Sequence, residues 1–191
     1  MIFEKQRILM KKYQSIESEN GFYYPTDLIV DINTMQGQTL LKNMSWRFIE
    51  EVGEALEALF VFSHKEHFKE ELIDGLHFLT ELLILSGISE TSFLHYFNDK
   101  LNQEFKESDH QKIFQDVAII VQNIGTSMNC LKMKPWAKTH TLTDSIKYVE
   151  KLKSTYCSFL DFLFNVMTPE DILNYYFRKS NVNQFRQSSN Y

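Results

Sequence analysis

The sequence predicts an all-α fold, and three observations support this prediction. Apolar residues recur at helical spacing along almost the whole chain, and no segment alternates strictly between apolar and polar positions as a half-buried strand does. Glycine and proline are scarce, with six and three residues, so few positions interrupt a helix. Hydrophobic residues make up 43% of the chain, enough to bury a sizeable core. We therefore expect one helical domain over residues 1–191.

The order of the helices follows from this spacing and from the residues that interrupt it. In chain order they should cover about 2–19, 37–62, 66–85, 90–105, 109–131, 142–167 and 169–187. Gly21 and Pro25 end the first helix. Thr168 and Pro169 give the clearest start signal, an N-cap followed by proline in the first helical position. The second and third helices are joined by a short turn, so they should pack as an antiparallel hairpin.

Composition and charge exclude several kinds of partner. The formal net charge of −5 offers no basic surface to a nucleic acid duplex. The longest apolar run, GLHFLTELLILSGI, is too short to span a bilayer, so we expect no membrane partner. The first residues do not resemble a secretory signal, and the two cysteines, Cys130 and Cys157, lack zinc-type spacing. These features favour a cytoplasmic protein.

Four glutamates crowd the stretch IEEVGEALEAL at residues 49–59, although like charges one turn apart on a helix repel each other. On a helical wheel, Glu50, Glu54 and Glu57 lie nearly opposite the apolar arc, whereas Glu51 lies at its edge. Because Glu51 and Glu54 are three residues apart, both can reach one point from neighbouring turns.

The next predicted helix repeats this spacing with Glu71 and Asp74. Glu71 shares a strip with Phe78, so its carboxylate should be partly desolvated, whereas Glu70 and Glu81 should lie toward the more polar side. If the two helices pack antiparallel, both acidic pairs can face one groove, and Mg²⁺, which prefers oxygen ligands, would offset their repulsion. By spacing alone, two solvated acidic surfaces are an equally good interpretation.

The two acidic motifs together resemble those of a known superfamily. Glu51-Val-Gly-Glu54, sixteen intervening residues and Glu71-Leu-Ile-Asp74 are similar to the ExxE and ExxD motifs of the all-α nucleoside triphosphate pyrophosphatases, which include the MazG proteins and the dimeric dUTPases. The extension DGLHF resembles the segment after ExxD in the dimeric dUTPase branch. The Trp- and Lys-rich stretch that this branch carries between the motifs is replaced here by FVFSHKEHFKE.

The C-terminal segment YFRKSNVNQFRQSSNY, residues 176–191, resembles the terminal motif of the same branch. The positions that fit are Tyr176, Lys179, Asn183, Phe185, Arg186, Gln187 and Tyr191. Ser180 and Asn190 depart from it. A wheel places most of the matching polar residues on one side of the last helix and Val182 and Phe185 on the other. Without the resemblance, the polar side would be interpreted as solvated.

The resemblance implies a helical bundle with a central four-helix core that hydrolyses a deoxynucleoside triphosphate to the monophosphate and pyrophosphate. The leading substrate is dUTP, with dCTP or another nucleotide as alternatives. The implied cofactor is Mg²⁺, held by Glu51, Glu54, Glu71 and Asp74, with Glu51 also deprotonating the attacking water. Family members commonly dimerise, so a homodimer is expected.

The resemblance also implies substrate contacts. Lys179 and Arg186 would neutralise phosphate oxygens, and Asn183 would bind the sugar or a phosphate. Trp46, five residues before Glu51, is a candidate for the base pocket, with a core position as the alternative. Two rival functions stay open. A di-iron carboxylate bundle needs Glu-x-x-His on two helices, which this chain lacks, and a non-catalytic helical scaffold would leave the acidic surface solvated.

Overall fold

The computed structural model describes residues 2–101, 108–134, 136–138 and 141–188. Its helices are α1 (Ile2–Glu19), α2 (Met35–Phe60), α3 (Lys65–Leu85), the 3₁₀ turn η1 (Glu90–Phe93), α4 (Leu94–Leu101), α5 (His110–Met128), α6 (Ser145–Val166) and α7 (Pro169–Ser188). Within these described ranges there is no strand. The all-α prediction is therefore confirmed.

Most helix ends lie within about three residues of their predicted positions, and side-chain caps explain several of them. The Thr34 hydroxyl accepts a hydrogen bond from the Gly37 N–H at 3.1 Å, which starts α2 at Met35. The predicted cap of the last helix is present, because the Asp171 N–H donates to the Thr168 hydroxyl at 3.2 Å. The predicted helix over 90–105 differs, because it begins as η1 and its end falls outside the described residues.

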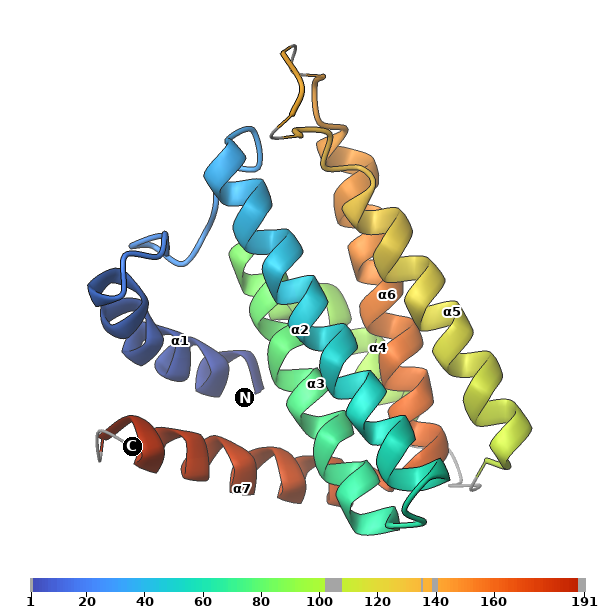
Figure 1. Cartoon of the computed structure of the whole chain (residues 1–191). Helices are drawn as coiled ribbons and strands as arrows, with labels where there is room; N and C mark the ends of the chain where they lie inside the picture. The colour runs from blue at the N-terminus through green and yellow to red at the C-terminus, as the bar shows by residue number, and fades with distance from the viewer. Residues whose placement is uncertain (1, 102–107, 135, 139–140, 189–191) are drawn as a thin grey trace.

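Two antiparallel hairpins form the body of the protein, as Figure 1 shows. The first is α2 with α3, as predicted, and the second is α5 with α6. Their packing centres on Gly75 of α3, where a Cβ atom would meet the rings of Phe159 at 3.4 Å and Phe48 at 3.6 Å. These two rings meet edge to face with centroids 5.0 Å apart. The small residue thus lets α2, α3 and α6 approach closely.

Two further helices, α1 and α7, lie across the side of α3 that the hairpins leave open (Figure 1). As a result α3 has neighbours on every side, and most of its residues from Glu71 to Leu85 are buried. Polar residues on α3 are therefore buried even at positions that a helical wheel of this helix alone predicts to be exposed, and Glu81 is an example.

Gly53 offers a direct test of local helix energetics. It lies in the interior of α2, where glycine costs about 1 kcal/mol relative to alanine. A Cβ atom there would meet nothing within 4 Å. Gly53→Ala should therefore stabilise the protein by up to about 1 kcal/mol, raising its melting temperature by about 2–4 °C in thermal unfolding. A lower melting temperature would show that another chain or segment needs this space.

Candidate active site

Three acidic side chains meet between the two helices of the first hairpin. Carboxylate oxygens of Glu51 on α2 and of Glu71 and Asp74 on α3 lie within 4.8 Å of one another. Glu71 is buried, whereas Glu51 and Asp74 are half-buried and so remain accessible from the surface. Glu54, one turn further along α2, is exposed and lies outside this cluster, although its charge contributes to raising the pKa of Glu51. We call Glu51, Glu71 and Asp74 the carboxylate cluster.

A proton on Glu51, an imidazole and a lysine lie against the carboxylates of the cluster. Burial, a hydrogen bond with Glu71 and the charge of Asp74 raise the pKa of Glu51 to about 8, so Glu51 holds a proton at neutral pH. His67 Nδ1 lies 3.0 Å from a Glu71 oxygen. Lys179 Nζ lies 2.5 Å from Asp74 Oδ2, but burial outweighs this partner and the pKa of Asp74 is still raised. The cluster is thus short of positive charge.

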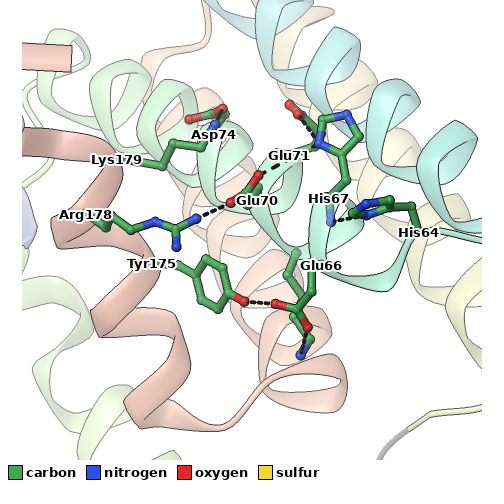
Figure 2. Close-up of polar contacts among 10 residues, drawn as sticks. His64, Glu66, His67, Glu70, Glu71, Asp74, Tyr175, Arg178 and Lys179 are labelled. Atoms are coloured by element: carbon green, nitrogen blue, oxygen red, sulfur yellow. Dashed lines mark hydrogen bonds and ion pairs between the residues drawn. The ribbon is translucent and has the colours of Figure 1, made fainter. Parts of the chain in front are cut away.

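Helix α7 is fixed over the cluster by a row of contacts with α3, drawn in Figure 2. The Tyr175 hydroxyl donates to Glu66 and the Arg178 guanidinium donates to Glu70. The third contact is the ion pair of Lys179 with Asp74. Because the three donors are spaced i, i+3 and i+4 along one side of α7, the contacts set its register on α3 and hold Lys179 at the cluster.

A cavity of about 190 Å³ opens beside the carboxylate cluster. It is walled by α1, α2, α3 and α7, and its lining residues are Gln6, Leu9, Tyr13, Glu51, Asp74, His77, Phe78, Glu81 and Asn183. The cavity therefore joins two of the three clustered carboxylates to aromatic and amide groups. Charged and aromatic groups in one lining suit a ligand with an anionic part and a planar part.

A buried hydrogen-bond network forms the floor of this cavity. The Gln6 amide nitrogen donates to Glu81 at 3.2 Å, and the Tyr24 hydroxyl donates to the other Glu81 oxygen at 2.7 Å. The Gln6 amide oxygen accepts from the Tyr176 hydroxyl at 3.0 Å and lies 2.8 Å from His77 Nδ1. The His77 and Tyr176 rings stack with centroids 4.0 Å apart. The network ties α1 and α7 to α3.

This network fixes the protonation of its members. Burial lowers the pKa of His77 to about 3, opposed only in part by the Tyr176 backbone, so the imidazole is neutral. Because the Gln6 oxygen is an acceptor, Nδ1 carries the proton. Nε2 is then an acceptor, and it is buried without a hydrogen-bond partner among the described residues. Burial also raises the pKa of Glu81 to about 7, since it outweighs the hydrogen bonds from Tyr24 and Gln6.

The side of α7 that carries the terminal motif faces inward, and the solvated alternative is wrong for most of it. Tyr176 is fully buried, Lys179 is half-buried at the cluster, and Asn183 lines the cavity. Arg186 is exposed, yet its charge lowers the pKa of both Tyr13 and Asp74, so it lies close to the site. Asn190 and Tyr191 lie outside the described residues.

A comparison with protein families matches residues 31–191 to the family described as dUTPase. The matched region contains the carboxylate cluster and the whole of α7. The chain belongs to the dUTPase family. It is a hydrolase of the nucleoside triphosphate diphosphatase type, which decides against the scaffold and di-iron alternatives. The searches of curated proteins and of solved structures return no match.

One expectation about this dUTPase-family chain, the position of Glu81, and one alternative, a core position for Trp46, are wrong. Glu81 does not lie on a polar side of α3, because α1 and Tyr24 cover it and leave it 4% exposed. Trp46 is not a core residue, because it is 61% exposed. It also lies outside the lining of the cavity. In addition, no helix in the described ranges is long and apolar enough to be a candidate membrane span.

Sequence reasoning missed several groups around the dUTPase site. Gln6 and Tyr13 come from α1, and His67 comes from the first turn of α3. A signal existed for Gln6, an uncharged polar residue between Phe3 and Leu9 on an otherwise apolar side of the first helix. For His67 the signal was its position four residues before Glu71, one helical turn away.

Proposed function

We propose that the protein hydrolyses dUTP between the α and β phosphates, releasing dUMP and pyrophosphate. The observation that carries this proposal is the crowded carboxylate cluster beside Lys179, two members of which line a cavity that also has aromatic residues in its wall. The cluster and Lys179 suit the triphosphate with its counter-ion, and the cavity suits the base.

The residues of the cluster fit a magnesium ion, which we propose as the cofactor. Carboxylate oxygens are the ligands that Mg²⁺ prefers, and a bound cation would offset the burial, the hydrogen bond with Glu71 and the neighbouring negative charges that raise the pKa of Glu51. Glu51, Glu71 and Asp74 would hold the ion, with Glu54 joining them by a change of its exposed side chain. The ion would supply positive charge to the phosphate oxygens.

The remaining polar groups have separate roles in this proposal. A cation at the cluster would favour the carboxylate form of Glu51, which then accepts the proton of the attacking water. Lys179 exchanges its contact with Asp74 for a phosphate oxygen, and Arg186 binds a second phosphate. Asn183 binds the sugar or a phosphate from the cavity wall.

We propose that the cavity wall selects uracil over cytosine. His77 Nε2 is a buried acceptor without a hydrogen-bond partner among the described residues, and a turn of the His77 side chain toward the cavity would let it accept the N3–H of uracil. Cytosine has an acceptor at its own N3, so dCTP would leave both groups unpaired in the same pose. Phe78, on the same wall, supplies an aromatic surface for the base. We assign the base contact to His77 and Phe78 rather than to the exposed Trp46.

The proposal also covers the domain organisation, the oligomeric state and the location of the protein. We propose that residues 1–191 form one domain, because a single cluster of buried residues draws on all the long helices. We further propose a homodimer in the cytoplasm, where two free thiols, Cys130 and Cys157, persist.

A nucleotide panel tests the proposed function. With Mg²⁺, pyrophosphate should be released fastest from dUTP and more slowly from dCTP, and EDTA should stop both reactions. Mg²⁺ alone should raise the melting temperature of the wild type but not that of Glu71→Gln, which separates ion binding from catalysis. The proposal fails if every triphosphate stays intact, or if release continues at the same rate in EDTA.

A further inference from the structure

We propose that Arg47 is a further specificity-determining residue, which donates a hydrogen bond to O4 of the uracil base. This role rests on the proposed function and adds to it a residue that belongs neither to the sequence motifs nor to the cavity lining. Arg47 lies in α2, four residues before Glu51. Residues four apart share one side of a helix and are separated by about 6 Å along it. Arg47 therefore lies one turn beyond the carboxylate cluster.

The ring of Phe78 places Arg47 beside the part of the cavity that takes the base. The Arg47 guanidinium carbon lies 6.0 Å from the centroid of the Phe78 ring. Phe78 lines the cavity next to His77, and both carry the base contact in the proposed function. The step of one turn from Asp74 to Phe78 runs in the same direction as the step from Glu51 to Arg47, because α2 and α3 are antiparallel (Figure 1). Arg47 is thus displaced from the cluster toward the base.

The charge of Arg47 acts on a second residue in the same part of the cavity. Glu81, two turns beyond Asp74 on α3, also lines the cavity. Burial raises the pKa of Glu81 to about 7, and the positive charge of Arg47 acts in the opposite direction. The contact with Phe78 and the influence on Glu81 agree, so the guanidinium lies at the rim of the base-binding end of the cavity.

The Arg47 side chain is available to a ligand. It is exposed, and within the described residues neither an ion pair nor a hydrogen bond holds its guanidinium. The cations of α7 differ in this respect, since Arg178 donates to Glu70 and Lys179 donates to Asp74. A contact with an aromatic ring at about 6 Å is at the outer limit for a cation–π interaction, so the guanidinium can move from the ring toward the cavity at little cost.

A guanidinium at this rim distinguishes uracil from cytosine, because it offers only hydrogen-bond donors. Uracil has an acceptor at O4, whereas cytosine carries the N4–H₂ donor at the same position. O4 is next to the N3–H that the proposed function assigns to His77, so one pose of uracil satisfies His77 and Arg47 together. In that pose cytosine would place two donors against each other at Arg47 and two acceptors against each other at His77. The two side chains therefore recognise adjacent positions of the base edge.

Arg47→Met tests this assignment, since methionine keeps an unbranched stem that can pack on Phe78 but donates no hydrogen bond. With Mg²⁺, kcat/KM should fall about 30-fold for dUTP, the size of one hydrogen bond to a charged group, and should stay within about threefold for dCTP.

Arg7→Met is the matched control. The Arg7 guanidinium carbon also lies 6.0 Å from a ring centroid, that of Phe3, but Arg7 lies outside the lining of the cavity. This variant should keep the wild-type preference for dUTP over dCTP. An unchanged preference in Arg47→Met, or an equal loss for both nucleotides, would overturn the role of Arg47 in base recognition.

Binding of uncleavable nucleotides separates this role from the proposed function. Analogues of dUTP and dCTP with an imido group between the α and β phosphates can bind but cannot be hydrolysed there. In titration calorimetry with Mg²⁺, Arg47→Met should weaken binding of the dUTP analogue about 30-fold and that of the dCTP analogue by no more than about threefold.

The outcomes of this titration are distinct. A wild type that shows the preference in binding but cleaves no triphosphate would refute the proposed function and leave the role of Arg47 intact. A wild type that cleaves dUTP, and whose preference in binding survives Arg47→Met, would refute the role of Arg47 alone. A wild type that binds neither analogue would refute both.

Discussion

Glu51→Gln should lower the rate of pyrophosphate release from dUTP about 1,000-fold, within the range of 10²–10⁴ attributed to a positioned base. The amide cannot accept the proton of the attacking water, and it weakens the set of anionic ligands. The fold should persist, because the amide can donate to Glu71 as the protonated Glu51 does. The measurement is a rate at saturating dUTP and Mg²⁺, with circular dichroism as the check of folding.

Glu50→Gln is the matched control, since it removes one carboxylate from the adjacent, exposed position of α2. Its rate should stay within about twofold of the wild-type rate, because Glu50 lies outside the carboxylate cluster. Equal losses in the two variants would mean that the acidic field as a whole, rather than a base at Glu51, supports the reaction. Full activity in Glu51→Gln would remove Glu51 from the mechanism.

Local sequence patterns are enough to predict the helices and the carboxylate cluster. Apolar spacing marks each long helix, and Thr168 and Thr34 are side-chain caps that depend only on residues a few positions away. The cluster can be predicted because Glu71 and Asp74 are three residues apart and because α2 and α3 form a hairpin with a short turn. Local spacing plus one antiparallel contact is enough to bring these side chains together.

The floor of the cavity depends on contacts that no local pattern encodes. Gln6 meets His77 and Glu81 across 71 and 75 positions of sequence, and only the docking of α1 on α3 joins them. A wheel of an isolated α3 therefore misplaces Glu81. The same limit applies to α7, where Phe185 stays 71% exposed while the polar side turns inward. Contacts with α3 decide which side is covered, and hydrophobicity alone does not.

Glu81→Gln should change the pH dependence of stability, because burial raises the pKa of Glu81 from 4.5 to about 7. The folded state then holds the proton more tightly than the unfolded state does. Ionisation of Glu81 consequently costs the wild type stability as the pH rises from 4.5 to 7. At 1.36 kcal/mol for each pKa unit, the full cost above pH 7 is on the order of 3 kcal/mol, and below pH 4.5 it vanishes.

The measurement is urea unfolding of the wild type and Glu81→Gln between pH 4 and pH 8. The variant should gain on the wild type by about 3 kcal/mol across this range, whatever the constant offset from its altered hydrogen bonds with Tyr24 and Gln6. His77 acts in the opposite direction, since its lowered pKa makes stability rise with pH between 3 and 6.5, but it is present in both proteins and cancels in the difference.

A constant difference between the two proteins would mean that Glu81 ionises in the folded state as readily as in the unfolded one. The Tyr24 hydroxyl and the Gln6 amide would then have to offset its burial in full, which two neutral donors rarely do for a carboxylate that is 4% exposed. The floor of the cavity would carry a negative charge at neutral pH, close to an anionic substrate. A protonated Glu81 removes that repulsion, so the same titration that measures stability also reports whether the cavity is electrically suited to a nucleotide.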